Sequence, residues 1–159
     1  LSSYGVDCGD NLLNLIKKVH EVEGIERIRL GSLEPRLITE EFTKELSTLK
    51  KICPHFHLSM QSGCNDTLLR MNRHYTSEEY YEKCQLLRKY FENPAITTDV
   101  IVGFPQESVE EFEITKAFVE KVNFYETHVF KYSKREGTNA AKMSGQIDEK
   151  EKARRRCFP

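Results

Sequence analysis

Hydrophobic and polar residues alternate along this chain in two different patterns. Short runs rich in β-branched and aromatic residues are separated by longer stretches in which apolar residues recur at helical spacing. In the first long stretch, Leu12, Leu15, Ile16 and Val19 fall on one face of a helix. Strands that alternate with amphipathic helices are typical of βα units around a parallel sheet. The pattern therefore predicts an α/β fold.

The same patterns locate the individual elements. Strands are expected at 25–31, 56–60, 96–102 and 126–132. Helices are expected at 11–22, 39–50, around 68–71, after Thr76, at 108–121 and from near Asp148. The expected N-caps are Asp10, Thr39, Thr76 and Ser108, because short polar side chains accept hydrogen bonds from the first helical amides. The last helix is highly charged, and we expect it to be solvated.

Composition narrows the class of protein. Lys and Arg total 24 against 25 Asp and Glu, so the net charge of −1 gives no electrostatic argument for nucleic acid as a partner. The apolar runs are too short to cross a membrane. The five cysteines are odd in number and lack CxxC spacing, which favours a reducing, cytoplasmic location. The chain does not begin with Met, and we expect it to be part of a longer protein.

Candidate functional residues lie where the predicted strands end. Ligands of parallel sheets bind beyond the carboxyl ends of the strands, where the loops are free to vary. Asp99 lies inside a very apolar strand, so its carboxylate needs a hydrogen-bond donor. The donor is either the diol of a bound ribose or a neighbouring loop or arginine. The polar or small residues at the strand ends are Ser32, Glu34, Gln61, Ser62, Asp99, Gly103, Tyr132 and Ser133.

Five motifs, in this order, resemble the radical-SAM methylthiotransferase family over nearly the whole chain. They are Arg-Leu-Gly-Ser-Leu-Glu-Pro at 29–35, His-Leu-Ser-Met-Gln-Ser-Gly-Cys at 57–64, Met-Asn-Arg-His-Tyr-Thr at 71–76, Asp-Val-Ile-Val-Gly-Phe-Pro at 99–105 and Tyr-Ser-Lys-Arg-Glu-Gly-Thr at 132–138. The resemblance implies that 1–159 is the central and C-terminal part of a partial (β/α) barrel, with about four of six strands and one open edge. Two motifs are most similar to the branch that methylthiolates threonylcarbamoyladenosine beside the tRNA anticodon.

The resemblance also implies how S-adenosylmethionine is held. Gln61 and Asp99 match positions that bind its ribose, for which an amide and a carboxylate are suitable acceptors. Arg73 matches the arginine that pairs with the methionyl carboxylate. Ser32 and Glu34 match positions that approach the methionine end. The alternatives are a surface helix charge for Arg73 and, for Glu34, a carboxylate that holds a loop through backbone amides.

Further residues of these motifs are expected near the cofactor. Ser62 follows Gln61 at the strand end, and Gly103 lets the backbone approach the adenine. Ile101 and Phe130 are expected to flank the adenine ring, with plain core packing as the alternative. The loop residues Tyr132, Ser133 and Arg135 are expected to contact cofactor or tRNA, with a solvated loop as the alternative.

One feature of the family is missing from this sequence. Reductive cleavage of S-adenosylmethionine needs a 4Fe-4S cluster held by a CxxxCxxC loop, which we expect upstream of residue 1. The second cluster domain and the RNA-binding domain of the family are absent too. We therefore expect an inactive fragment of a tRNA methylthiotransferase, whose open edge is covered by self-association or by its own termini. The histidines lack metal spacing, so no metal site is expected. The alternatives are another radical-SAM activity or a non-catalytic binding or scaffold module.

Overall fold

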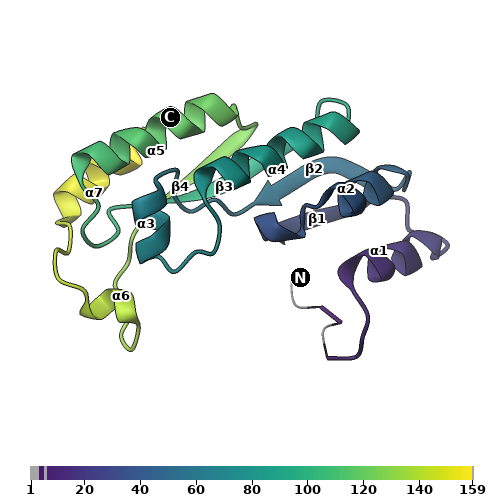
Figure 1. The fold of residues 1–159 in the computed structure, drawn as a ribbon, viewed down its shortest axis with the longest axis horizontal. Coiled ribbons are helices and arrows are strands. Elements are labelled where there is room, and N and C mark those ends of the chain that lie inside the picture. Colours follow the sequence, from purple (N-terminus) through teal and green to yellow (C-terminus); the bar gives the residue numbers. More distant parts are fainter. Residues whose placement is uncertain (1–3, 6, 159) are drawn as a thin grey trace.

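The structure is a computed structural model that describes residues 4–5 and 7–158, and it is a single parallel sheet covered by helices (Figure 1). The strand order is β1-β2-β3-β4, and every neighbouring pair is parallel. This arrangement confirms the α/β fold expected from the sequence pattern. The strands are β1 (Ile28–Leu33), β2 (Ile52–Leu58), β3 (Ala95–Val102) and β4 (Glu126–Lys131).

The helices begin close to the predicted positions because their N-caps are encoded locally. Thr39, Thr76 and Ser108 cap α2, α4 and α5, and the last two form capping boxes with a glutamate three residues on. The prediction for the first helix is wrong, because Asn11 rather than Asp10 accepts the hydrogen bond from the Asn14 amide. The helices are α1 (Leu12–Glu21), the 3-10 helix η1 (Pro35–Leu37), α2 (Glu40–Ser47), α3 (Asn65–Arg70), α4 (Ser77–Tyr90), α5 (Val109–Val122), α6 (Asn139–Lys142) and α7 (Glu149–Arg156).

Two strands are shifted from their predicted positions. Strand β1 starts at Ile28, whose amide donates to the carbonyl of Lys51 at 2.7 Å, and it continues to Leu33. Strand β2 ends at Leu58 rather than at Met60. The chain leaves the backbone ladder there because the Met60 amide donates to the side-chain hydroxyl of Thr98 instead.

Helices α2, α4 and α5 lie side by side over one face of the sheet (Figure 1). Alternate residues of β3 point toward them, and Ile96, Val100 and Val102 are almost completely buried there. Tyr80 of α4 lies fully buried at the centre of this layer, with its ring 6.3 Å from that of Phe118 in α5. The other residues of β3 point to the opposite face, which is only partly covered.

The sheet is open on both sides. Strands β1 and β4 each have one neighbour among the strands that the structure describes, so the expectation of a single open edge is wrong. Two edges follow directly from an unclosed four-stranded sheet, because a barrel removes edges only when its first and last strands pair.

The expectation that the last helix is solvated is also wrong. Helix α7 packs against β4 and β3, and its Lys152 and Arg155 are only 5% and 3% exposed. The Arg155 guanidinium reaches Glu107, a fully buried carboxylate after β3, at 2.6 Å. Desolvation raises the pKa of Glu107 above its ordinary value, although the Gly103 amide and Arg155 both stabilise its charge. One face of α7 is therefore part of the core.

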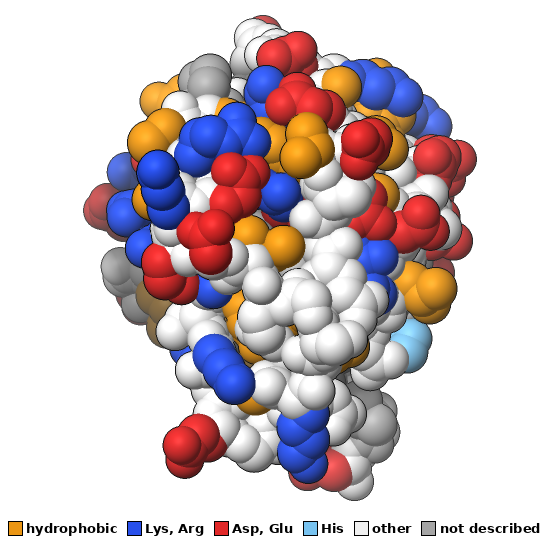
Figure 2. Space-filling model, turned by 90° about the vertical axis from the view of Figure 1, so that its left-hand side faces the viewer, with side chains coloured by type: hydrophobic (Ala, Val, Ile, Leu, Met, Phe, Trp, Pro, Cys, Tyr) orange, Lys and Arg blue, Asp and Glu red, His pale blue; other side chains and the backbone are white. Residues whose placement is uncertain are grey.

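The surface at the α3, α6 and α7 end of the molecule carries mixed charge. Figure 2 shows this end, with acidic and basic side chains interspersed and smaller hydrophobic areas between them. This distribution agrees with the nearly neutral net charge of the chain. In the described part of the chain, no helix is both long and apolar enough to cross a membrane.

Candidate functional site

The loop after β2 is held in place by hydroxyl groups from neighbouring elements. The hydroxyl of Thr98 in β3 donates to the Leu58 carbonyl at 2.6 Å and accepts from the Met60 amide at 3.0 Å. The phenol of Tyr75 donates to the Met60 carbonyl at 2.9 Å. Burial raises the pKa of Tyr75 to about 12, so this phenol stays a donor at neutral pH. These bonds fix the backbone immediately before Gln61.

Gln61 itself is locked to β3 in a strained conformation. Its amide donates to the Asp99 carbonyl, and its own carbonyl accepts from the Ile101 amide, both at 2.8 Å. Its backbone φ of 70° lies in the left-handed region, which residues other than glycine rarely adopt. The residue is only 8% exposed. Strain of this kind persists only where the surroundings over-determine it, and it is concentrated at functional sites.

An open cavity of about 550 Å³ lies beyond the ends of β3 and β4, next to Gln61. It contains eight of the twelve residues predicted for the site: Gln61, Arg73, Asp99, Ile101, Phe130, Tyr132, Ser133 and Arg135. These residues come from four separate segments of the sequence. The cavity lies at the carboxyl edge of the sheet, where the sequence predicted a ligand site.

The cavity combines one carboxylate, several cations and an apolar wall. Ile101 and Phe130 are direct partners in the β3–β4 register, so their side chains lie next to each other on the same face. Phe130 is 53% exposed, which is unusual for a large apolar residue in a strand. Arg73, Lys131 and Arg135 bring positive charge to the same cavity. Such a cavity suits a ligand that has an aromatic part and an anionic group.

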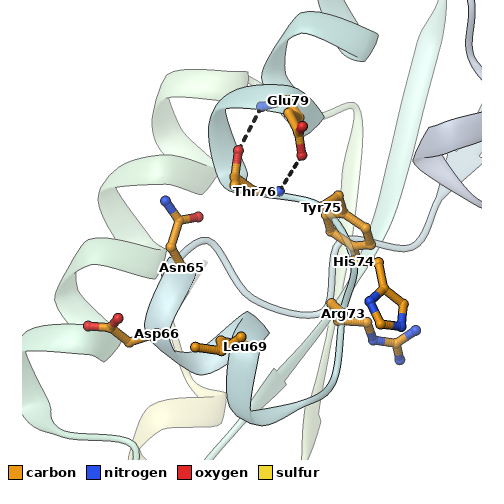
Figure 3. A pocket seen from close by; sticks show the side chains of 8 residues that line it. All are labelled: Asn65, Asp66, Leu69, Arg73, His74, Tyr75, Thr76 and Glu79. Atoms are coloured by element: carbon orange, nitrogen blue, oxygen red, sulfur yellow. Dashed lines mark hydrogen bonds between the residues drawn. The ribbon is translucent and has the colours of Figure 1, made fainter.

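Arg73 reaches the cavity from the loop between α3 and α4. The same loop borders a second hollow of about 390 Å³, which is lined by Asn65, Asp66 and Leu69 on one side. In Figure 3 the guanidinium of Arg73 extends away from Asn65 and Asp66, on the opposite side of the loop. Arg73 thus borders both hollows, and its guanidinium lies on the side of the loop away from Asn65 and Asp66.

Four predicted residues lie outside the cavity lining. Ser32 is exposed at the end of β1 with a φ of 52°, and the Glu34 carboxylate accepts from the Arg36 guanidinium at 2.8 Å. This contact of Glu34 is with a side chain of its own loop and not with the backbone amides expected in the alternative. Ser62 and Gly103 lie outside the lining as well.

The side chains of Ser62 and Gly103 face structural partners. The fully buried hydroxyl of Ser62 lies 3.1 Å from that of Thr115 in α5, on the helix side of the sheet. The Ser62 side chain is therefore directed toward α5 and away from the cavity. Gly103 has a φ of 72°, and a Cβ atom there would lie 2.4 Å from Cγ of Lys152. Glycine is therefore needed at this position because α7 packs close to the backbone.

The described residues do not fit an iron–sulfur cluster. All five cysteines are free thiols: Cys53, Cys64 and Cys84 are buried, whereas Cys8 and Cys157 are exposed. Across residues 4–5 and 7–158, the group with metal-ligand spacing is Cys64, Asp66 and Glu111, which has a single thiol. A 4Fe-4S cluster needs three or four thiolates.

That group is better explained as part of an ion pair. The Glu111 carboxylate accepts from the Arg70 guanidinium at 2.9 Å and also completes the capping box of α5. Burial opposes the ionisation of Glu111, but Arg70 and the Ser108 amide outweigh it and hold its pKa below the ordinary value. A metal ion would have to displace Arg70.

Five residues of the cavity were not predicted: Met71, Phe104, Lys131, Thr138 and Ala140. Met71 and Phe104 lie inside recognised motifs, so the signal was present, but their apolar side chains suggested packing. Thr138 ends the last recognised motif and caps α6, and Ala140 lies within α6, which was not predicted as an element. Thr98 and Tyr75 orient Gln61 through tertiary contacts, so this role was not predictable although Tyr75 lies in a recognised motif.

Comparison with known proteins identifies relatives of the chain. A model described as the Radical SAM superfamily matches residues 3–119. The chain is 43% identical over 157 residues to tRNA-2-methylthio-N(6)-dimethylallyladenosine synthase of Caldicellulosiruptor saccharolyticus, covering 98% of the chain and 33% of that protein. It is 45% identical over 154 residues to threonylcarbamoyladenosine tRNA methylthiotransferase of Bacillus subtilis, covering 96% and 34%.

A solved structure confirms the partial barrel. Coproporphyrinogen III oxidase from Escherichia coli, described as a radical SAM enzyme, matches with a TM-score of 0.69 at 17% identity. The match covers 89% of this chain and 33% of that one. The chain thus spans about a third of the length of each of these three proteins.

Proposed function

Because this chain belongs to the radical SAM superfamily and is homologous to tRNA methylthiotransferases over nearly its whole length, we propose that it forms the S-adenosylmethionine-binding section of such an enzyme. The observation that carries the proposal is the pairing of Gln61 with β3. This pairing brings an amide side chain and the Asp99 carboxylate together at the edge of the cavity.

Each part of the cofactor has a chemically suitable partner in the cavity. Gln61 and Asp99 offer acceptors for the two ribose hydroxyls. Ile101 and Phe130 offer apolar surface for the adenine, and the exposure of Phe130 is consistent with this use. The Arg73 guanidinium would pair with the methionyl carboxylate, for which its planar fork is well suited.

The loop after β4 is proposed to contribute to the same site. Tyr132, Ser133 and Arg135 also border the cavity, where they can contact the cofactor or a tRNA substrate. Bound S-adenosylmethionine would supply the radical chemistry and the methyl group of the reaction. The residues described here would bind and orient it and keep water away from its apolar side.

The catalytic cluster must come from outside the described residues. Because their thiols do not form a suitable set, we propose that 1–159 alone is inactive and that a longer protein supplies the cluster ligands and the tRNA-binding surface. The proposed substrate is a modified adenosine next to the anticodon. The chain is 43% identical to the first of these relatives and 45% identical to the second, so overall identity favours neither branch. The proposal of the threonylcarbamoyladenosine branch rests on motif similarity alone.

The test uses the full-length protein reconstituted with iron and sulfide. With a reductant and tRNA it should form 5′-deoxyadenosine and a methylthioadenosine that mass spectrometry detects in tRNA digests. Arg73→Met and Asp99→Asn should raise the KM for S-adenosylmethionine. Arg36→Met is the matched control, because Arg36 is exposed and pairs with Glu34 outside the cavity. Absence of both products would overturn the proposed function.

A further inference from the structure

His57 connects two residues of β3 on the cavity side of the sheet. Its Nε2 atom lies 3.2 Å from Oδ2 of Asp99, and its Nδ1 atom lies 3.0 Å from the Thr97 hydroxyl. The His57 and Asp99 side chains are 17% and 31% exposed, so this contact is partly shielded from water. His57 and Thr97 are direct partners in the β2–β3 register, which brings the imidazole ring over β3.

The chemistry of the two partners determines where the proton sits. A carboxylate can only accept hydrogen bonds, so Nε2 of His57 must be the donor to Asp99. In the neutral ring Nδ1 is then the acceptor, and the Thr97 hydroxyl donates to it. Both ring nitrogens thus form hydrogen bonds, and only one orientation of the ring satisfies both partners.

We propose that His57 is a positioning residue that holds Oδ2 of Asp99 and so directs Oδ1 toward the ligand in the cavity. The inference rests on the proposed function, since the ligand is taken to be S-adenosylmethionine. A carboxylate on a strand can rotate about its side-chain bonds, and a charge-assisted hydrogen bond to one oxygen removes that freedom. The Asp99 backbone is fixed independently by Gln61.

The other polar residues of this face have different partners. His55 lies two residues before His57 on the same strand and face, and it contacts the Arg29 guanidinium at 3.1 Å instead. His128 is the direct partner of Asp99 in the β3–β4 register, but its Nε2 atom lies 3.9 Å from a Glu126 oxygen. His55→Gln is therefore a matched control, because it changes a histidine of the same face without touching Asp99.

The first experiment does not depend on the cofactor. Nitrogen-15 NMR of 1–159 at about pH 9, well above the ordinary histidine pKa of about 6.5, reports which ring nitrogen carries the proton. We expect His57 to be protonated at Nε2. Asp99→Ala and Thr97→Val should each weaken this preference, whereas His55→Gln should leave it unchanged. A proton on Nδ1 of His57 in the unmodified chain would overturn the proposal.

The second experiment measures the consequence for binding in the reconstituted full-length protein. His57→Leu should raise the KM for S-adenosylmethionine about tenfold, as expected for the loss of one hydrogen bond to a charged group, and leave kcat unchanged. His57→Gln keeps an amide donor and should recover part of the loss. A fall in kcat with an unchanged KM, or no change in either, would contradict the positioning role.

The two experiments separate this inference from the proposed function. If the unmodified enzyme forms no 5′-deoxyadenosine, the proposed function fails, and the ring-nitrogen signals still decide whether His57 donates to Asp99. If turnover is normal but His57→Leu behaves like His55→Gln, the proposed function stands and the role of His57 is refuted.

Discussion

Replacing Arg155 with methionine removes the cation that neutralises Glu107 in the core, while keeping a side chain of similar length. Glu107 then keeps the Gly103 amide, which donates to it at 2.7 Å, but loses the guanidinium contact at 2.6 Å. Removing one partner of a buried ion pair costs about 3–5 kcal/mol, because the other charge stays buried without compensation. We expect Arg155→Met to lose free energy of unfolding in this range.

Urea unfolding followed by far-ultraviolet circular dichroism measures this loss. With a slope of about 2 kcal/mol per molar urea, the unfolding midpoint should fall by roughly 1.5–2.5 M. Arg154→Met is the matched control: Arg154 lies next to Arg155 on the same helix, but its side chain is 57% exposed and forms an exposed ion pair with Glu151. Its midpoint should not change measurably.

The size of the loss should depend on pH. Desolvation raises the pKa of Glu107 above its ordinary value of 4.5, and removing Arg155 raises it further. Between pH 4.5 and the raised pKa, Glu107 keeps its proton in the folded state but has lost it in the unfolded chain. The free energy of unfolding therefore falls as pH rises through this range. The deficit of Arg155→Met should therefore be smallest in acid. Adding Glu107→Gln, which removes the buried charge, should restore part of the stability at neutral pH. A midpoint shift no larger than that of Arg154→Met would refute this reasoning.

Two further predictions concern Gln61 and the sheet edges. Gln61→Gly should stabilise the chain by roughly 1 kcal/mol by relieving the left-handed backbone, yet raise the KM for S-adenosylmethionine. Gln106→Gly, at an exposed position with a φ of 66°, should leave KM unchanged, and an equal KM for both variants would count against a binding role of Gln61. Strands β1 and β4 should be protected by self-association or by the termini, so light scattering should show dimers or hydrogen exchange should show protected edge amides. A monomer with rapidly exchanging edge amides would contradict that expectation.

The fold was predictable from the sequence because its signals are local. The caps Thr39, Thr76 and Ser108 act within one helical turn, and the apolar runs that mark strands are continuous in sequence. The meeting of Gln61 with Asp99 followed from one topological rule, since parallel strands end at the same edge of the sheet.

The errors have physical reasons that sequence patterns do not contain. Ser62 follows Gln61 directly, but its hydroxyl meets that of Thr115 in α5 on the helix side of the sheet, so membership of one motif could not place both side chains in the cavity. The charge run at 149–156 resembles a solvated helix, because nothing local indicates that Arg155 will meet a carboxylate 48 residues earlier. The support of Asp99 by His57 likewise depends on the register between two strands.

The packing of α7 sets the boundaries for isolating this domain. The family match ends at residue 119, but β4, the Lys152 stem over Gly103 and the partner of Glu107 all come from later residues. A recombinant piece ending at residue 119 would lack the outer strand and leave a carboxylate uncompensated in its interior. A border drawn at the end of the family match would therefore divide this packing unit, whereas a piece that extends through Phe158, whose ring packs on that of Phe112, retains it.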